Sequence, residues 1–341
     1  ASQSKVKAIS GATADEMSQI EEMSKKLGRT TKFSASEISE GFSYMALAGW
    51  DATQQLSAMP GVVNLAIAGE MDLAAASDIV TDYLTAFGLG AEYAGEMADM
   101  MAYAMSHSNM NVEQLGEAWK NSAANMNAAG QSMQTTTAIL EAFSNAGAKG
   151  SEAGIKLRAI MRDVTSKMQD GAITIGDTTV QVQDANGNFR DLIDILADVE
   201  TGTDGMGTAA RAAALSAVFT DDSITGVNMA LQEGVDNIRN YKSQLEDCDG
   251  AAESMSKTMN NNLSGSMKNL SSAAEGLGNA VYSYIGGPLT DVVDGVTDAI
   301  NDITDAIEPQ VTEVTRFVDL VVEAKNKIND AVSTADANYT T

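Results

Sequence analysis

Cysteine and histidine are almost absent from this chain of 341 residues, which contains one of each, Cys248 and His107. A single cysteine cannot form a disulfide within the chain, so nothing indicates an oxidising compartment. A zinc site needs clustered ligands, and these two residues lie far apart in the sequence. A nucleophilic triad would have to use His107, for which a capping or surface role near a helix end is the simpler interpretation. We expect no catalytic residue, no metal site and no cofactor.

Long apolar runs are missing as well. No run of about 18 apolar residues predicts a membrane span, and the first ten residues, ASQSKVKAIS, contain no apolar signal core. The chain also begins without methionine. We therefore expect a processed chain or, in preference, a segment of a longer protein.

Basic residues are scarce relative to acidic ones, 21 against 47, which gives a net charge of −26. Such a chain is repelled by nucleic acid and by anionic membrane surfaces, so we expect no direct nucleic-acid binding. A well-solvated surface is the simplest explanation of this charge. The more specific alternative explanation is a surface selected not to adhere to nucleic acid that slides past it.

Proline and aromatic residues are few, with 3 prolines and 5% aromatics, which favours helices packed through small and flexible apolar side chains. Residues 30 to 168 show short amphipathic segments separated by glycine. Capping-box patterns at Thr13 and at Ser34 predict helix starts, and Gly28 and Gly49 predict helix ends. We interpret a methionine stripe as core filler; it comprises Met97, Met100, Met101 and Met105.

Residues 172 to 190 depart from the helical period. Ile173, Ile175, Val180 and Val182 alternate with polar residues, and turn signals stand at 176–177 and 186–187. We predict a small β-hairpin here, with helix resuming over 191–245. The segment 184–191, DANGNFRD, has its glycine at the wrong position for a calcium-binding EF-hand loop, so a hairpin turn explains it better.

From about residue 254 the apolar positions repeat every seven residues, which indicates a coiled-coil seam. An intramolecular helical hairpin explains the same pattern. β-Branched residues at both core positions favour three or more strands if the seam joins separate chains, so a homotrimer is the favoured oligomer. The candidates for self-association are Leu289, Val293, Val296, Ile300, Ile303, Ile307, Val311, Val314, Val318 and Val321.

The expected fold is mainly α: a multi-helix domain of short glycine-capped helices with a small β-hairpin insertion, followed by longer heptad-patterned, coiled-coil-like helices. We expect three parts. Residues 1–28 form an amphipathic helix, the end of a longer rod. Residues 29–250 form a helical core domain that contains the hairpin, and residues 251–341 form the heptad-patterned helices.

Several sequence strings resemble the conserved core region of phage tail tape measure proteins. The run from Leu27 to Ala66 resembles the family's threonine-lysine-phenylalanine lead, then its ALAGW helix end, then a proline-glycine start of the next helix. Segments 72–89, 145–161, 184–192, 211–219 and 277–293 are also similar to the family. The motif residues are Thr31, Phe33, Ala46, Leu47, Ala48, Gly49, Trp50, Asp51, Pro60, Gly61, Gly147 and Gly150.

The resemblance implies a structural, non-enzymatic segment of a phage or prophage tape measure protein. Such a protein is made in the bacterial cytoplasm, lies in the lumen of the tail, contributes to tail assembly and tail length, and is released at genome ejection. The implied partners are other copies of the chain, tail-tube proteins, baseplate or tail-tip proteins and tail-assembly chaperones. Two alternatives stay open: a helical peptidoglycan hydrolase segment of a tail protein, and a secreted helical effector or adhesin.

Overall fold

The structure is a computed structural model that describes residues 2–260. The chain divides into two units, Ala1–Ser272 and Ala273–Thr341, and the described residues all belong to the first. The heptad-patterned segments at 289–307 and 311–332 lie outside the described residues, so the self-association seam stays a prediction, as does the division into three parts.

The described residues are mostly helical, which confirms the predicted fold class. The first nine helices and one short 3-10 helix follow each other directly: α1 (Ser2–Ser10), α2 (Ala14–Thr30), α3 (Ala35–Leu47), α4 (Ala52–Ala68), α5 (Leu73–Ala86), η1 (Ala91–Tyr93), α6 (Ala94–His107), α7 (Val112–Ala128), α8 (Met133–Asn145) and α9 (Gly150–Lys167). A hairpin and five helices complete them: β1 (Ala172–Ile175), β2 (Thr178–Gln181), α10 (Leu192–Thr203), α11 (Thr208–Ser216), α12 (Asp221–Glu233), α13 (Val235–Glu246) and α14 (Ala251–Asn260).

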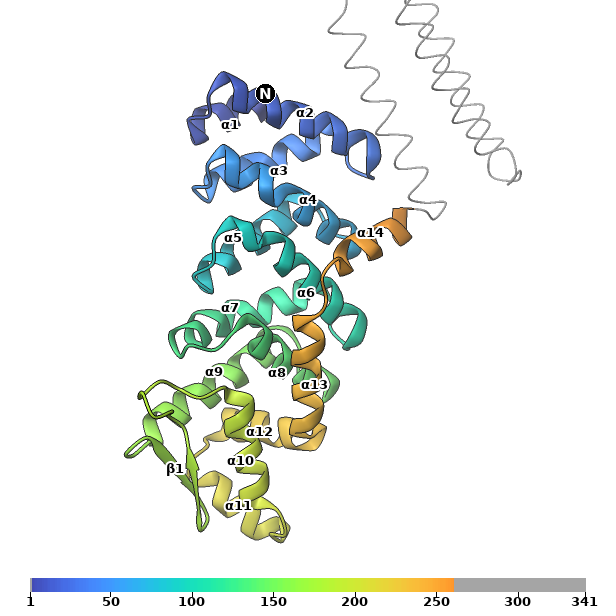
Figure 1. Ribbon diagram of the computed structural model, residues 1–341. Helices are drawn as coiled ribbons and strands as arrows, with labels where there is room; N and C mark the ends of the chain where they lie inside the picture. The colour runs from blue at the N-terminus through green and yellow to red at the C-terminus, as the bar shows by residue number, and fades with distance from the viewer. Residues whose placement is uncertain (1, 261–341) are drawn as a thin grey trace, which may run out of the picture. The chain divides into compact units, whose positions relative to one another are not determined.

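Helices α1 to α9 form a two-layer stack. Each helix packs against the next one and against the next but one, so that α1, α3, α5, α7 and α9 form one layer and α2, α4, α6 and α8 form the other. The linkers alternate between the two edges of the stack (Figure 1). This is the arrangement of an α-solenoid, in which short helices gain a core by stacking on their neighbours.

After a three-residue linker at 11–13, a four-residue linker recurs along the stack, starting at residues 31, 48, 69, 87, 108, 129 and 146. The starts of alternate four-residue linkers lie 38 to 42 residues apart, which is the length of a two-helix repeat. The linker after α3 shows its chemistry. Gly49 has a φ of +89°, Trp50 turns back to donate from its backbone N–H to the carbonyl of Met45 at 3.1 Å, and Asp51 caps α4. The same returning hydrogen bond ends four other helices, with donors Met71, Leu89, Gln131 and Ala148. The linkers thus end one helix and start the next within four residues.

Glycine inside several helices allows the layers to approach closely. A Cβ atom at Gly154 of α9 would lie 2.1 Å from the carbonyl oxygen of Ala118 in α7. A Cβ atom at Gly61 of α4 would lie 3.0 Å from the Cα of Gly95 in α6. At both crossings backbone packs directly on backbone, which explains why glycine occurs in helix interiors that it otherwise destabilises.

Several predicted helix boundaries need correction. The capping boxes at Thr13 and Ser34 are confirmed, but segment 1–28 holds two helices, separated after Ser10. The second helix runs past Gly28 to Thr30, so Gly28 does not end it. Glycine is needed at this position for close packing, because a Cβ atom here would lie 2.6 Å from the backbone nitrogen of Ala35. Pro60 does not start a helix: it lies inside α4, which the Asp51 cap starts eight residues earlier. The exposed proline forgoes one backbone hydrogen bond there.

The predicted hairpin is confirmed as an antiparallel pair, in which Ile173 faces Val180 and Ile175 faces Thr178. After α12 the chain returns along the stack: α13 packs against α8, and α14 packs against α4 and α6 (Figure 1). We call α13 and α14 the return strap. The Asp99 carboxylate of α6 accepts hydrogen bonds from the backbone N–H groups of Gly250 and Ala252, both at 2.9 Å, and so caps the start of α14.

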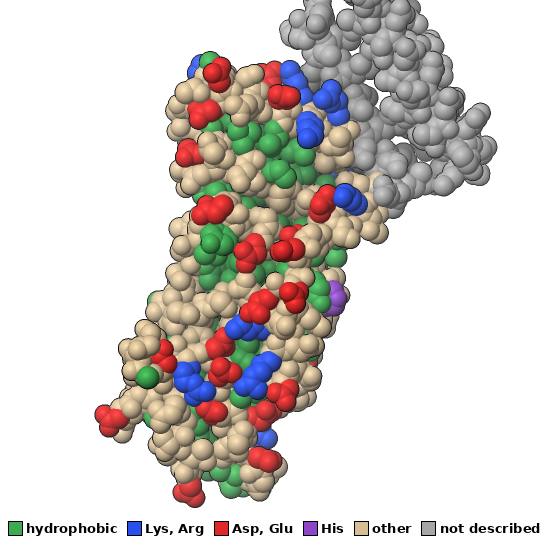
Figure 2. Space-filling model, viewed as in Figure 1, with side chains coloured by type: hydrophobic (Ala, Val, Ile, Leu, Met, Phe, Trp, Pro, Cys, Tyr) green, Lys and Arg blue, Asp and Glu red, His purple; other side chains and the backbone are tan. Residues whose placement is uncertain are grey.

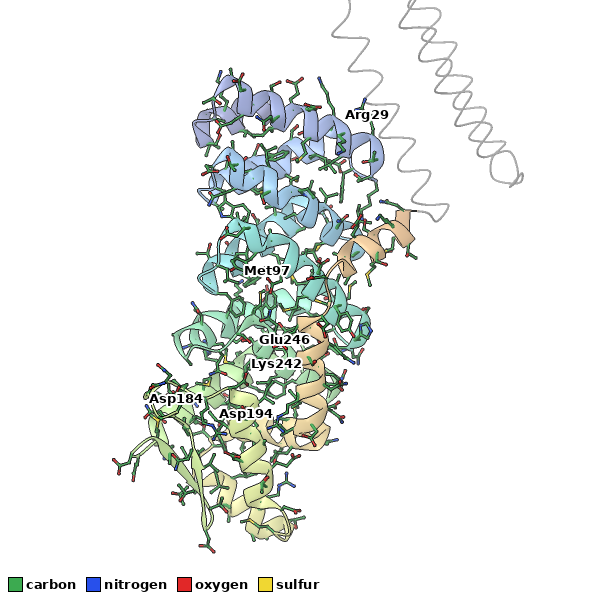
Figure 3. The ribbon with its side chains drawn as sticks, viewed as in Figure 1. Arg29, Met97, Asp184, Asp194, Lys242 and Glu246 are labelled. Carbon is green, nitrogen blue, oxygen red and sulfur yellow. The ribbon has the colours of Figure 1, made fainter. Side chains whose placement is uncertain are left out.

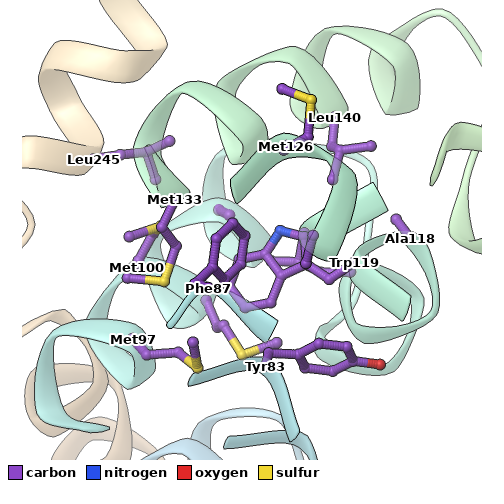
Figure 4. Close-up of a cluster of buried hydrophobic side chains, with 14 of the residues drawn as sticks. Tyr83, Phe87, Met97, Met100, Ala118, Trp119, Met126, Met133, Leu140 and Leu245 are labelled. Carbon is purple, nitrogen blue, oxygen red and sulfur yellow. The ribbon is translucent and has the colours of Figure 1, made fainter. Parts of the chain in front are cut away.

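The core of the stack is rich in methionine around one tryptophan (Figure 4). Trp119 is fully buried, and the rings of Tyr83 and Phe87 meet it edge-on, with centroids 5.6 and 5.4 Å away. Of the methionine stripe, Met97, Met100 and Met101 are fully buried and Met105 is partly buried. These flexible side chains act as the predicted core filler between short helices that meet at irregular angles.

Candidate interaction surfaces

The motif residues that carry the family resemblance have two kinds of position. Most of them form helix ends: Gly147 and Gly150 adopt positive φ around the start of α9, and Thr31 accepts a hydrogen bond from the backbone N–H of Phe33 at 3.3 Å. The side chains of Phe33, Ala46 and Trp50 are buried, whereas those of Leu47, Ala48, Asp51 and Pro60 are exposed. The ALAGW string therefore contains both a helix-ending turn and a solvent-facing leucine.

Large apolar side chains are exposed at three positions among residues 6–260: Ile9, Leu47 and Tyr93, which are 39%, 58% and 40% exposed. Ile9 and Leu47 lie at the ends of α1 and α3, and Tyr93 lies just before α6. These positions adjoin the linkers that join an odd-numbered helix to the next even-numbered one, and those linkers share one edge of the stack (Figure 1). We call this set of three residues the apolar edge. Single exposed apolar side chains are common on protein surfaces, so it is the shared edge, and not the exposure alone, that makes these residues a candidate contact surface.

The stretch that carries most of this edge is free of basic residues. Between Lys32 and Lys120 the sequence contains no lysine or arginine but twelve aspartates and glutamates. Acidic side chains are accordingly scattered along the stack in Figure 2. The helices α3 to α6 contribute no lysine or arginine, so a partner that docks over them meets acidic side chains, which favours a basic protein surface over nucleic acid.

Basic residues gather instead at the end of α2 and its linker to α3, where Lys25, Lys26, Arg29 and Lys32 lie (Figures 2 and 3). Lys25 pairs with Glu21 at 2.7 Å, and Lys32 donates to the backbone carbonyl of Ala66 at 3.4 Å. Arg29 lies in the last turn of α2, where a cation stabilises the helix dipole, so this local role explains one member of the group.

The two residues with catalytic potential are poorly placed for catalysis. His107 is exposed and stacks on Tyr103, with ring centroids 3.8 Å apart. Its Nδ1 lies 2.8 Å from the Ser106 hydroxyl and 2.9 Å from the backbone carbonyl of Tyr103, so one nitrogen meets both groups. Burial raises the pKa of Cys248 to about 12, with a further contribution from Asp99. A thiol with this pKa is a poor nucleophile at neutral pH.

One ionisable side chain is buried under the return strap. Glu141 of α8 is 1% exposed, its Oε1 has no hydrogen-bond partner in the described part of the chain, and burial raises its pKa to about 8. When Glu141 is ionised, its charge adds to the effect of burial in raising the pKa values of Tyr103 of α6 and Tyr241 of α13. Glu141 therefore stays protonated at neutral pH between α8 and the strap. The sequence does not distinguish Glu141 from the many other acidic residues in helices, because its burial depends on the packing of α8 against other helices.

Across residues 2–260 no group of three or more histidine, cysteine, aspartate or glutamate side chains could hold a metal ion. Within the same range no helix is both long enough and apolar enough to cross a membrane.

A family model described as phage-related minor tail protein matches residues 21–220, more than half of the chain. The chain therefore belongs to the phage-related minor tail protein family. It is 32% identical over 293 residues to a tape measure protein of Pneumococcus phage Dp-1, covering 86% of this chain and 26% of that protein. It is 24% identical over 294 residues to a probable tape measure protein of Escherichia phage P2, covering 84% of this chain and 36% of that protein.

These similarities confirm the predicted resemblance to tape measure proteins. The chain spans about a quarter of the first relative's length and about a third of the second's. No solved structure matches the chain.

Proposed function

We propose that this chain is a structural, non-enzymatic segment of a phage or prophage tape measure protein, which acts in tail assembly inside the tail tube by binding other tail proteins. The family match over residues 21–220 carries this proposal, because that range contains most of the α-solenoid. Solenoids present long rows of equivalent positions along one edge, and they commonly serve as binding surfaces.

The geometry of the stack argues against a role for this segment in setting tail length. Two stacked helices with their linkers use 38 to 42 residues and advance the stack by about one interhelical distance, roughly 10 Å. A continuous helix of 38 residues would extend about 57 Å. The described residues therefore contribute little length for their mass. Tail length would be set by extended parts of the protein, and this segment would supply contacts.

The apolar edge is the proposed contact surface. Its three side chains lie beside helix starts that carry carboxylates, such as Asp51 beside Leu47 and Glu92 beside Tyr93. A partner with apolar depressions rimmed by lysine or arginine fits this pattern. Tail-tube, tail-tip or chaperone proteins are the candidate partners, and no direct contact with nucleic acid is proposed. The homotrimer proposed from the heptad pattern is a separate contact.

A paired substitution in the phage or prophage that encodes the chain tests the contact surface. We expect Leu47→Glu with Tyr93→Glu to reduce the number of assembled tails in electron micrographs without changing the helical content of the purified chain. Ser57→Glu with Asn109→Glu adds the same charge at exposed positions off the edge and should leave assembly intact. Normal tail numbers with the first pair, or equal losses with both, would reject the apolar edge as the contact.

Zymography on purified cell wall tests the non-enzymatic part of the proposal. The purified chain should leave the substrate intact. A cleared band that appears at the mass of the chain would instead support the peptidoglycan hydrolase alternative.

A further inference from the structure

A groove with a volume of about 470 Å³ lies between α11 and α12. Its lining combines one cation, Arg211, with neutral polar side chains and an apolar wall, and it includes no carboxylate. Ile224, Asn228 and Leu231 lie four and three residues apart on one face of α12, so they present a continuous strip to the groove. Thr208 and Arg211 form the facing side on α11.

Arg211 has no anionic partner in the described part of the chain. Its Nε is shielded from solvent, yet no hydrogen bond reaches it. Three other arginines of this chain differ: Arg162, Arg190 and Arg239 each pair with an aspartate, at distances from 2.7 to 3.1 Å. Arg211 is half-buried, and its guanidinium is available to an acceptor from outside the chain, because a buried donor without a partner carries a desolvation cost that such an acceptor would offset.

We propose that this groove binds an aliphatic carboxylate, with Arg211 as its anchor. The planar guanidinium offers paired N–H donors that match the two oxygens of a carboxylate, and the neighbouring Asn228 amide can add a hydrogen bond. Ile224 and Leu231 form an apolar wall for a short aliphatic chain attached to that carboxylate. The absence of acidic groups from the lining lowers the repulsion that such a ligand meets over most of this acidic surface.

The carboxylate can be free or can belong to an acidic side chain of a protein, and the two sources share the same recognition chemistry. A free ligand would be a small branched-chain acid that fills the groove alone. A protein ligand would place aspartate or glutamate on Arg211 with a neighbouring leucine or valine against the wall. In the second case additional contacts outside the groove would increase the affinity.

Titration of the ¹⁵N-labelled full chain, followed through the side-chain Nε–Hε resonance of Arg211, tests this proposal. The probes are isobutyrate, its uncharged analogue isobutyramide, inorganic phosphate, and an acetylated, amidated peptide containing Asp-Leu. We expect a saturable shift with isobutyrate, with a dissociation constant in the millimolar range, and little shift with isobutyramide or phosphate. A dissociation constant at least about tenfold lower for the peptide would assign the site to a protein side chain, and the reverse order would assign it to a free acid.

Two variants control for indirect effects. Arg211→Gln should abolish the carboxylate-dependent shifts of the Asn228 side-chain amide while the circular dichroism spectrum stays unchanged. Arg158→Gln removes an exposed arginine elsewhere and should leave binding intact. Absence of saturation with both carboxylate probes would overturn the proposal. It would equally fail if the amide or phosphate bound as well as isobutyrate, or if binding persisted in Arg211→Gln.

Discussion

The buried carboxyl of Glu141 predicts that the stability of this protein falls as pH rises through neutrality. Burial raises its folded-state pKa to about 8, from an ordinary value of 4.5. Between these two values the folded chain holds a proton that the unfolded chain has released, so each rise in pH favours unfolding. Below about pH 4.5 both states are protonated and the effect vanishes; above about pH 8 the full loss is reached.

The size of the effect follows from the two pKa values. The interval from 4.5 to about 8, at 1.36 kcal/mol per pH unit, sets an upper limit of about 5 kcal/mol on the loss. Structural relaxation or water entry on ionisation would reduce this figure to a few kcal/mol. Even the reduced value is a large fraction of the stability of a typical domain. The strap over α8 is the element expected to loosen first, because Tyr241 of α13 feels the charge of Glu141.

The substitution Glu141→Gln keeps the shape of the side chain and removes its titration. We expect this variant to match the native chain in free energy of unfolding near pH 4.5 and to exceed it by several kcal/mol at pH 9. Urea denaturation followed by circular dichroism from pH 4.5 to 9 provides the measurement. Glu40→Gln, at an exposed position, serves as the control and should follow the native profile.

The difference in free energy of unfolding between each variant and the native chain reports on the substituted residue alone. The titration of the single histidine is common to all three proteins and cancels in that difference. A Glu141→Gln profile parallel to the native one would refute the reasoning. That result would mean that the carboxyl is hydrated or ionised in the folded protein.

Three further substitutions, the first with a matched control, test close packing and helix capping. Gly154→Ala should cost several kcal/mol in thermal denaturation, because its Cβ would lie 2.1 Å from a backbone carbonyl oxygen of α7; Gly95→Ala, with no neighbour within 4 Å, should be neutral or slightly stabilising. Asp163→Asn should destabilise by about 1–3 kcal/mol, because this 3% exposed carboxylate caps α12 through the backbone and hydroxyl of Thr220, at 2.8 and 2.7 Å. Asp99→Asn should speed hydrogen exchange in α14, whose first N–H groups it caps, and unchanged exchange there would reject the capping role.

The pH dependence of Asp163 has the opposite sign to that of Glu141. Burial alone would raise its pKa, but hydrogen bonds from Arg162, Ser223 and Thr220 outweigh burial and hold the pKa well below its usual range. Its stabilising contribution is therefore present above the usual aspartate pKa and is lost as pH falls below it. Acid and alkaline unfolding of this chain should thus begin at different helices.

Local sequence patterns predict most helix starts here because the relevant contacts span three residues. The boxes at Thr13 and Ser34 connect a side chain to a backbone group in the first turn, so they can be read directly from the sequence. The hairpin is similarly local. The role of a glycine is harder to predict. Gly49 ends a helix because it adopts a positive φ, whereas Gly28 and Gly154 lie within helices, where a side chain would clash with the backbone of another helix.

The solenoid itself escaped prediction from the sequence, although its linkers repeat. The four-residue pattern places a left-handed residue, a buried apolar residue and a cap in succession, but Glu70 replaces the glycine in one linker and Gln131 replaces the apolar residue in another. Intervals of 17 to 21 residues further obscure the period. The lack of a partner for Arg211 also could not be predicted from the sequence, because it depends on which side chains the fold brings close to the guanidinium.

The return strap changes how a stack of this kind should unfold. In a simple solenoid each repeat contacts only its neighbours, so unfolding can start at either end and proceed repeat by repeat. Here α13 and α14 contact α4, α6, α8 and α10, and single polar contacts fasten them: Lys242 to Asp191 at 2.7 Å, and Ser256 to Asn64 at 3.0 Å. Partial unfolding of any of these helices would also detach the strap, so α4 to α14 should unfold as one cooperative unit. The strap's main contacts do not include α1, α2 or α3. Near neutral pH, opening of the stack should therefore begin at this N-terminal end.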